Sequence, residues 1–180
     1  MAARGADEVL GVDARAEHVA DASLIRDALG LSRLRFQQSD VHTLDTAALG
    51  RFDLVLLFGL IYHLENPVGA LRIARELTAP GGVCVIETQI APGVSGWMDY
   101  GSYRFVRPIK GSFAIIDEID DTHGPEASTT GICLVPSLDA MHWILGKLGF
   151  SRVEEVPVPA DGYEQHVHHK RAMFACYLDA

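Results

Sequence analysis

Residues 52–67 read FDLVLLFGLIYHLENP. The apolar run is too short for an ordinary helix and ends at Gly59, and Asn66-Pro67 is a helix-start signal. This pattern predicts a buried parallel strand that delivers Tyr62 and His63 to its C-terminal edge. Ligands bind at that edge of open α/β sheets, because the connecting loops there can vary without disturbing the strands. We therefore expect the chemistry of this chain near Tyr62 and His63.

Strands and helices alternate on both sides of this stretch. Short apolar runs predict further strands at Glu8–Asp13, Leu34–Asp40 and Val83–Thr88. Apolar residues spaced three or four apart predict helices at Ala16–Leu29, at about Pro67–Leu77, and from a Ser137 cap to Leu148. This alternation is typical of an α/β fold whose parallel sheet is covered on both faces.

The second half of the chain departs from that alternation. Arg152–Val158 and Ala172–Leu178 are two more predicted strands, and their short connection leaves no room for a crossover helix, so we expect an antiparallel pair. Between Ala91 and Leu134 the periodicity fails. A segment this long without periodicity is more often a functional insertion or lid than a plain connection. We therefore predict a single domain over residues 1–180, with 91–134 as the insertion or lid.

Composition narrows the class of protein. The chain has 180 residues, 48% of them hydrophobic, which indicates one globular domain. Its formal charge of -9 disfavours a nucleic-acid partner, and the small basic group at 103–110 is more simply a solvated loop. No apolar run has membrane-spanning length and the start lacks a secretion signal, so we expect a cytoplasmic location. The three cysteines have apolar neighbours and are expected to be buried, reduced thiols.

Several strand ends carry residues that fit a known family. Gly11-Val12-Asp13 and Ser39-Asp40-Val41 end two strands, Tyr62-His63-Leu64 follows a third, and the turn Leu77–Gly82 precedes a fourth. Their order, with the antiparallel ending, resembles a class I S-adenosylmethionine-dependent methyltransferase. It is most similar to the bacterial small-molecule and tRNA wobble-uridine-modifying branches. The resemblance covers nearly the whole chain, is weakest at 91–134, and implies a Rossmann-like methyltransferase sheet.

The resemblance also implies residues that bind the cofactor S-adenosylmethionine. Asp13 would accept hydrogen bonds from the ribose hydroxyls, Asp40 would meet the adenine amino group, and Val41 would pack on the adenine ring. Phe58 and Gly59 complete the implied set. The alternative role for Asp13 is a cap for the helix that follows it, and the alternative for Asp40 is a turn or cap residue.

One part of the family's pattern is absent. The family's first strand and its glycine-rich loop, which approaches the methionine part of the cofactor, should precede Asp13, and no Gly-x-Gly loop appears there. The sheet would lack its central strand, leaving unpaired backbone groups between the strands of Asp13 and Phe58. We therefore expect a partial domain that binds S-adenosylmethionine weakly or not at all. A homo-oligomer or a partner chain could cover the gap.

Two side chains are candidates for catalysis. Methyl transfer from a sulfonium is an in-line displacement, to which a protein contributes positioning and, where the acceptor must lose a proton, a base. His63 suits that base, because imidazole titrates near neutral pH, although it could instead bond to backbone or stack beside the cofactor. Glu87 ends an apolar strand and is the second candidate, with a structural ion pair as its alternative. Tyr62 would line the acceptor pocket or fill the core under the next helix.

The remaining histidines carry weaker signals. His123 lies in the predicted lid, where it could contact the acceptor or simply belong to a solvated loop. His166, His168 and His169 suggest a metal site, but zinc sites normally need a further ligand, and none has recognisable spacing. We expect a polar hairpin tip there and no metal.

The sequence thus predicts transfer of a methyl group from S-adenosylmethionine to an oxygen or nitrogen of a small or medium acceptor molecule, with neither a nucleic-acid nor a membrane partner. The alternative is a noncatalytic methyltransferase remnant or subunit that does not bind the cofactor alone. A nicotinamide-binding dehydrogenase shares the acidic residue after its second strand. It fits the antiparallel ending and the Tyr62-His63 loop poorly.

Overall fold

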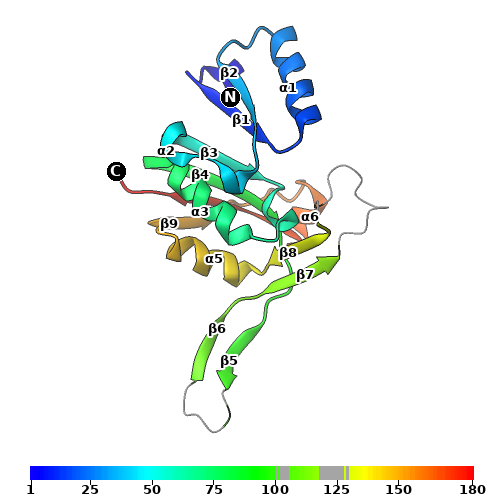
Figure 1. The fold of residues 1–180 in the computed structure, drawn as a ribbon. Helices are drawn as coiled ribbons and strands as arrows, with labels where there is room; N and C mark the ends of the chain where they lie inside the picture. Colours follow the sequence, from blue (N-terminus) through cyan, green and yellow to red (C-terminus); the bar gives the residue numbers. More distant parts are fainter. Residues whose placement is uncertain (100, 102–105, 118–127, 129) are drawn as a thin grey trace. The chain divides into compact units, whose positions relative to one another are not determined.

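A computed structural model describes residues 1–99, 101, 106–117, 128 and 130–180. Its ribbon is drawn in Figure 1. The chain divides into two compact units, Met1–Ala48 and Leu49–Ala180, and each is described by itself below. Among the described residues, no helix combines the length and the apolar character needed to cross a membrane.

The first unit is a strand–helix–strand motif. Strands β1 (Val9–Asp13) and β2 (Leu34–Gln38) pair in parallel, with Asp13 opposite Gln38, and α1 (Ala16–Ala28) connects them. Parallel neighbours need such a crossover, which is why the helix lies between them in sequence. The other elements are the short helices η1 (Ala2–Arg4), η2 (Val41–Thr43) and α2 (Thr46–Leu49), the last of which crosses the unit boundary.

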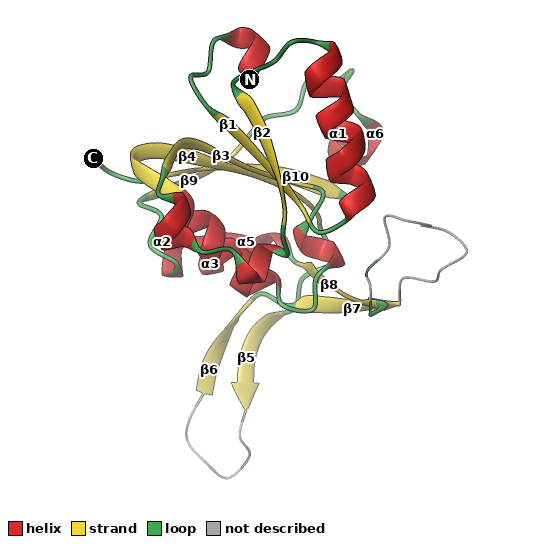
Figure 2. Ribbon diagram, turned by 45° about the horizontal axis from the view of Figure 1, so that its top comes forward, coloured by secondary structure: helices red, strands yellow, loops and turns green. Residues whose placement is uncertain are grey.

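The second unit contains a four-stranded sheet in the order β3-β4-β10-β9. Its strands are β3 (Phe52–Phe58), β4 (Thr78–Gln89), β9 (Arg152–Glu155) and β10 (Arg171–Tyr177). Strands β3 and β4 are parallel, whereas β10 is antiparallel to both of its neighbours. The helices of this unit are η3 (Ile61–His63), α3 (Pro67–Leu77), α5 (Leu138–Lys147) and α6 (Glu164–Val167). Figure 2 labels α3, α5 and α6.

These strands confirm the predicted α/β fold with parallel strands and an antiparallel C-terminal pair. Within the described residues, β1 pairs only with β2, and β3 pairs only with β4. Leu54, Leu56 and Phe58 alternate along β3 and are exposed, so they mark one apolar face of that strand.

Capping side chains begin the helices of the second unit where the sequence predicts. Asn66 accepts a hydrogen bond from the Gly69 N–H at 2.9 Å, and Pro67 follows at the first helical position. Ser137 caps α5 in the same way through the Ala140 N–H. Both helices bury an apolar stripe against the sheet, and the core includes Ala70, Leu71, Ala74, Ile86, Met141, Leu145 and Phe174.

Some predicted strand bounds need correction. Strand β9 ends at Glu155 and not at Val158, because Pro157 has no N–H with which to continue the ladder. Strand β4 begins at Thr78, directly after α3, and its register against β3 shifts before Leu54 pairs with Val83.

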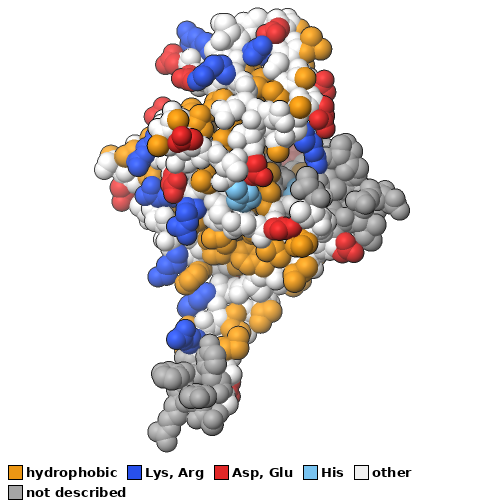
Figure 3. Space-filling view, viewed as in Figure 1, with side chains coloured by type: hydrophobic (Ala, Val, Ile, Leu, Met, Phe, Trp, Pro, Cys, Tyr) orange, Lys and Arg blue, Asp and Glu red, His pale blue; other side chains and the backbone are white. Residues whose placement is uncertain are grey.

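The predicted insertion, 91–134, contains hairpin strands that its composition concealed. Strands β5 (Ser95–Asp99) and β6 (Val106–Lys110) form one antiparallel ribbon, and β7 (Phe113–Asp117) pairs with β8 (Ile132–Pro136) in a second. Figure 3 shows hydrophobic side chains gathered over the β7–β8 hairpin, at the base of the β5–β6 ribbon. Ile115, Ile116 and Ile132 are exposed there. The role of this segment as a lid stays a prediction.

All three cysteines are buried, as predicted. Cys84 on β4 lies opposite Cys176 on β10. Burial raises the pKa of the Cys84 thiol to about 12. The pKa of Cys176 also rises, mainly through burial and secondarily through the nearby Cys84.

We expect Cys84 and Cys176 to react with iodoacetamide only when the second unit unfolds. The folded state holds both thiol protons, whereas an unfolded thiol ionises near pH 8.5. The unfolded state therefore binds fewer protons at alkaline pH, and stability should fall as the pH rises from about 8.5 toward 12. Mass spectrometry of labelled peptides over a urea series measures when the two thiols become reactive. Rapid labelling in native buffer would contradict the expected protection.

Candidate functional site

The carboxyl ends of β3 and β4 are joined by a glycine and a glutamate. The Gly59 N–H donates to both the backbone oxygen and the Oε2 atom of Glu87, each at 3.1 Å. Gly59 has a φ of 64°, a left-handed conformation that a β-carbon disfavours. This turn ends β3 and leads into η3, which carries Tyr62 and His63.

Glu87 pairs with Arg171, a residue that sequence reasoning missed. The guanidinium donates from Nε to Oε1 and from Nη2 to Oε2, the second at 2.8 Å. Glu87 is only 7% exposed, and the Arg171 side chain 13%. The hydrogen bond to Glu87 raises the pKa of Arg171 above its ordinary value, despite the opposing effect of burial. The pair is therefore a buried, bidentate ion pair.

Strand register explains how these two residues meet. Met173 on β10 lies opposite Glu87 on β4, and Arg171 is two residues before Met173. Because residues two apart on a strand share a face, Arg171 reaches the same side of the sheet as Glu87. The buried carboxylate signalled the need for a partner. The sequence did not identify that partner, because the pairing depends on the register between β4 and β10.

The same guanidinium orients the Tyr62 hydroxyl. The Nη1 and Nη2 atoms of Arg171 each lie 3.2 Å from the phenolic oxygen, and the guanidinium lies 4.9 Å from the Tyr62 ring centroid. Arginine has no acceptor atom, so the Tyr62 oxygen accepts both hydrogen bonds. Its own proton is left to donate elsewhere. The His63 ring stacks at a tilt against Tyr62, with centroids 4.1 Å apart.

His166 also reaches this cluster, from α6. Its Nε2 atom lies 3.3 Å from Glu87 Oε1, and its side chain is 13% exposed. Its Nδ1 atom is buried and makes no hydrogen bond to any described residue. The sequence suggested a polar hairpin tip at 166–169, but residues 164–167 form a short helix that turns His166 inward. Among the described residues, no group of three or more histidine, cysteine or acidic side chains is arranged to hold a metal ion.

The implied cofactor residues Asp13 and Asp40 lie in the first unit. Asp13 accepts a hydrogen bond from the Arg15 N–H at 2.8 Å, and its other oxygen lies 3.2 Å from His18 Nδ1. It therefore holds the turn before α1, since the N-cap residue is Arg15. Asp40 caps η2 through the His42 N–H. Both carboxylates remain about half exposed and so accessible to a ligand.

The remaining implied residues are placed as follows. Val41 is the first residue of η2, and Phe58 is the last residue of β3, with its side chain 53% exposed. The structure thus brings Tyr62, His63, Glu87 and Gly59 together, and adds Arg171 and His166 to them. His123 lies outside the described residues.

Residues 1–95 match the profile of a family described as a methyltransferase domain. The matched segment is more than half of the 180 residues. The chain belongs to this methyltransferase domain family. The predicted resemblance to class I S-adenosylmethionine-dependent methyltransferases is thereby confirmed.

Curated relatives of this methyltransferase-family chain include two kinds of enzyme. A ubiquinone biosynthesis O-methyltransferase of Psychrobacter cryohalolentis is 38% identical over 89 residues, which cover 49% of this chain and 34% of the relative. A tRNA U34 carboxymethyltransferase of Desulfotalea psychrophila is 33% identical over 93 residues, which cover 52% of this chain and 29% of the relative. These matches span about a third of the relatives' length.

Solved structures show the same fold. The N-terminal domain of EvdMO1 with SAH bound has a TM-score of 0.69 and 21% identity, over 97% of this chain and 66% of that one. An S-adenosylmethionine-dependent methyltransferase from Mesorhizobium loti has a TM-score of 0.65 and 19% identity, over 97% of this chain and 82% of that one. The fold of this chain is therefore the Rossmann-like methyltransferase fold.

Proposed function

We propose that this protein transfers a methyl group from S-adenosylmethionine to an oxygen or nitrogen of a small or medium acceptor molecule. Family membership supports methyl transfer. Several relatives are named as O-methyltransferases, and a glycopeptide N-methyltransferase with this fold, MtfA, is complexed with S-adenosylmethionine. The family match and these relatives do not favour the noncatalytic alternative.

The observation that carries this proposal is the pair of acidic strand ends in the first unit. Asp13 ends β1, and the Ser39 N–H donates to the Asp13 backbone oxygen at 2.9 Å, which holds Asp40 beside that strand end. A carboxylate at such a position binds two ribose hydroxyls, and leaving either partner unpaired is costly. We assign Asp13 to the ribose, Asp40 to the adenine amino group, and Val41 to the adenine ring.

The acceptor side of the proposal rests on the second unit. Tyr62 presents a hydroxyl proton that Arg171 leaves available, so it is suited to donate to an oxygen of the acceptor molecule. His63 adjoins it and is our candidate base for an acceptor that must lose a proton. Glu87 already binds Arg171 and Gly59, so we assign it to holding these groups in place.

We further propose that residues 1–180 form one partial methyltransferase domain, with 91–134 as its insertion. The edge of β3 that lacks a described partner is where a strand from elsewhere in a longer protein, or from a partner chain, would add to the sheet.

Separate alanine substitutions of Asp13 and His63 test the assigned roles. They are made in a form of the protein whose affinity for S-adenosylmethionine is measurable. Asp13→Ala is expected to weaken cofactor binding at least about tenfold, because a hydroxyl partner is lost. His63→Ala should change the dissociation constant by less than about threefold, while slowing methyl transfer by about 10²-fold or more. Equilibrium dialysis with labelled cofactor measures the binding.

Asp45→Ala is the matched control for this comparison. Asp45 also carries a carboxylate and accepts the N–H groups of Ala47 and Ala48 at the start of α2, without an assigned cofactor role. It should leave the cofactor affinity unchanged. Equal losses from Asp13→Ala and Asp45→Ala, or from Asp13→Ala and His63→Ala, would count against the assignment.

A further inference from the structure

A hollow of about 350 Å³ lies between α5 and the corner where β6 leads into β7. This volume is within the range of small-molecule sites. Its lining residues are Pro108, Lys110, Gly111, Ser112, Phe113, Ala140, Trp143 and Ile144. None of them contacts Glu87 or belongs to the group around it (Gly59, Tyr62, His63, His166 and Arg171), so the hollow is separate from the proposed acceptor side.

Hydrogen bonds through Ser137 hold together the two segments that line the hollow. Ser137 is 1% exposed, and its hydroxyl oxygen accepts the N–H groups of both Ser112 and Ala140, while its own N–H donates to the Ser112 oxygen at 2.8 Å. These bonds tie the β6–β7 corner to the start of α5. A preformed site loses less conformational entropy when it binds a ligand.

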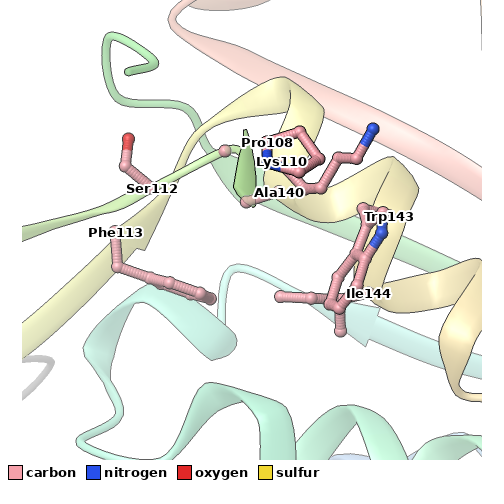
Figure 4. Close-up of a pocket in the computed structure, with 8 residues that line it drawn as sticks. Pro108, Lys110, Ser112, Phe113, Ala140, Trp143 and Ile144 are labelled. Atoms are coloured by element: carbon pink, nitrogen blue, oxygen red, sulfur yellow. The ribbon is translucent and has the colours of Figure 1, made fainter. Parts of the chain in front are cut away.

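The walls are flat and mostly apolar. Figure 4 shows Phe113 and Ile144 pointing toward one another across the hollow, with Pro108 and Lys110 on the side of Trp143. Trp143 is 46% exposed, so its ring is accessible to a ligand in the hollow. A planar ring entering this space would pack against aromatic and aliphatic side chains.

Positive charge converges on the same place. The whole chain has only three lysines, Lys110, Lys147 and Lys170, within a formal charge of -9. Lys110 lines the hollow, and the Lys147 ammonium lies 5.7 Å from the centroid of the Trp143 ring. Two of the three lysines therefore flank one tryptophan, and no other charged side chain lines the hollow among the described residues.

We propose that this hollow binds a small planar aromatic carboxylate. The ring of the ligand stacks on Trp143 and Phe113, and its carboxylate pairs with Lys110 in the field of Lys147. An apolar side chain from a second copy of the chain would leave Lys110 without a counter-charge, which is why charge complementarity favours the anion. This inference goes beyond the proposed methyl transfer and does not depend on it.

Fluorine NMR with 4-fluorobenzoate tests the proposal on the whole chain, with 4-fluorobenzyl alcohol as the matched neutral probe. We expect the carboxylate to bind at least about tenfold more tightly than the alcohol. The double variant Lys110→Met/Lys147→Met should weaken carboxylate binding about tenfold, and Trp143→Leu should weaken the binding of both probes. Lys170→Met should leave the affinity within about twofold, since Lys170 does not line the hollow.

Three results would overturn the proposal. The first is equal binding of the carboxylate and the alcohol. The second is undiminished carboxylate binding by the Lys110→Met/Lys147→Met variant. Both lysines are exposed, so their replacement leaves the buried core unchanged. The third is a dimer in sedimentation velocity that Trp143→Leu dissociates, together with no carboxylate binding, because a second copy would then occupy the hollow.

Discussion

Glu87→Ala is expected to lower the free energy of unfolding of the 49–180 unit by about 3–5 kcal/mol, the usual cost of removing one partner from a buried ion pair. The substitution leaves the Arg171 guanidinium, 13% exposed, without its carboxylate. It also deprives the Gly59 N–H of one acceptor and leaves Arg171 less firmly placed against Tyr62. Urea denaturation followed by circular dichroism measures the loss.

A double-mutant cycle separates the ion pair from the rest of the cluster. Glu87→Ala/Arg171→Met removes both charges, so it should be less destabilising than Glu87→Ala alone. Glu87→Gln keeps an oxygen for the Gly59 N–H but loses the charge. Its free energy of unfolding should therefore lie between those of the wild type and Glu87→Ala. A loss below about 1 kcal/mol for Glu87→Ala would mean that the pair is not buried as described.

Gly111→Ala is expected to destabilise the second unit by about 3 kcal/mol or more, through the sum of overpacking and a left-handed backbone. An added β-carbon would lie 2.3 Å from the Ala140 nitrogen and 2.6 Å from its α-carbon, and the φ of Gly111 is 116°. Hydrogen bonds between Ser112 and Ser137 hold these two backbones together. Thermal and urea denaturation both report the change.

Gly96→Ala is a closely matched control. Gly96 has the same φ of 116°, and an added β-carbon there meets no atom within 4 Å. This variant therefore carries only the backbone cost, about 1–2 kcal/mol. Similar losses at the two positions would show that the close approach of the β6–β7 corner to α5 does not hold in solution.

Local sequence signals predicted most of the fold because they act within one element. The apolar run that ends at Gly59, the Asn66 cap and the Ser137 cap each specify an element from its own residues. The antiparallel ending followed from the short connection before β10. These features do not depend on contacts between distant residues.

The features that the sequence did not reveal depend on register or on long-range pairing. Glu87 and Arg171 are 84 residues apart, and their meeting follows from how β10 aligns with β4. His166 lies in a histidine-rich segment whose composition indicates a polar tip, yet one turn of helix directs it to Glu87. The hairpins of 91–134 lacked clear alternation because Gly, Pro and exposed aromatic residues interrupt their strands.

The central claim is that Asp13 and Asp40 hold the nucleoside end of the cofactor. The most direct test is a ¹⁵N–¹H NMR titration with S-adenosylhomocysteine, which maps the backbone amides that shift when it binds. We predict shifts of the backbone amides of Asp13, Asp40 and Val41 that saturate only in the millimolar range, because no Gly-x-Gly loop precedes Asp13 in these 180 residues. Asp13→Ala should abolish them. Unchanged amides at Asp13 and Asp40, shifts that survive Asp13→Ala, or low-micromolar affinity would contradict the account.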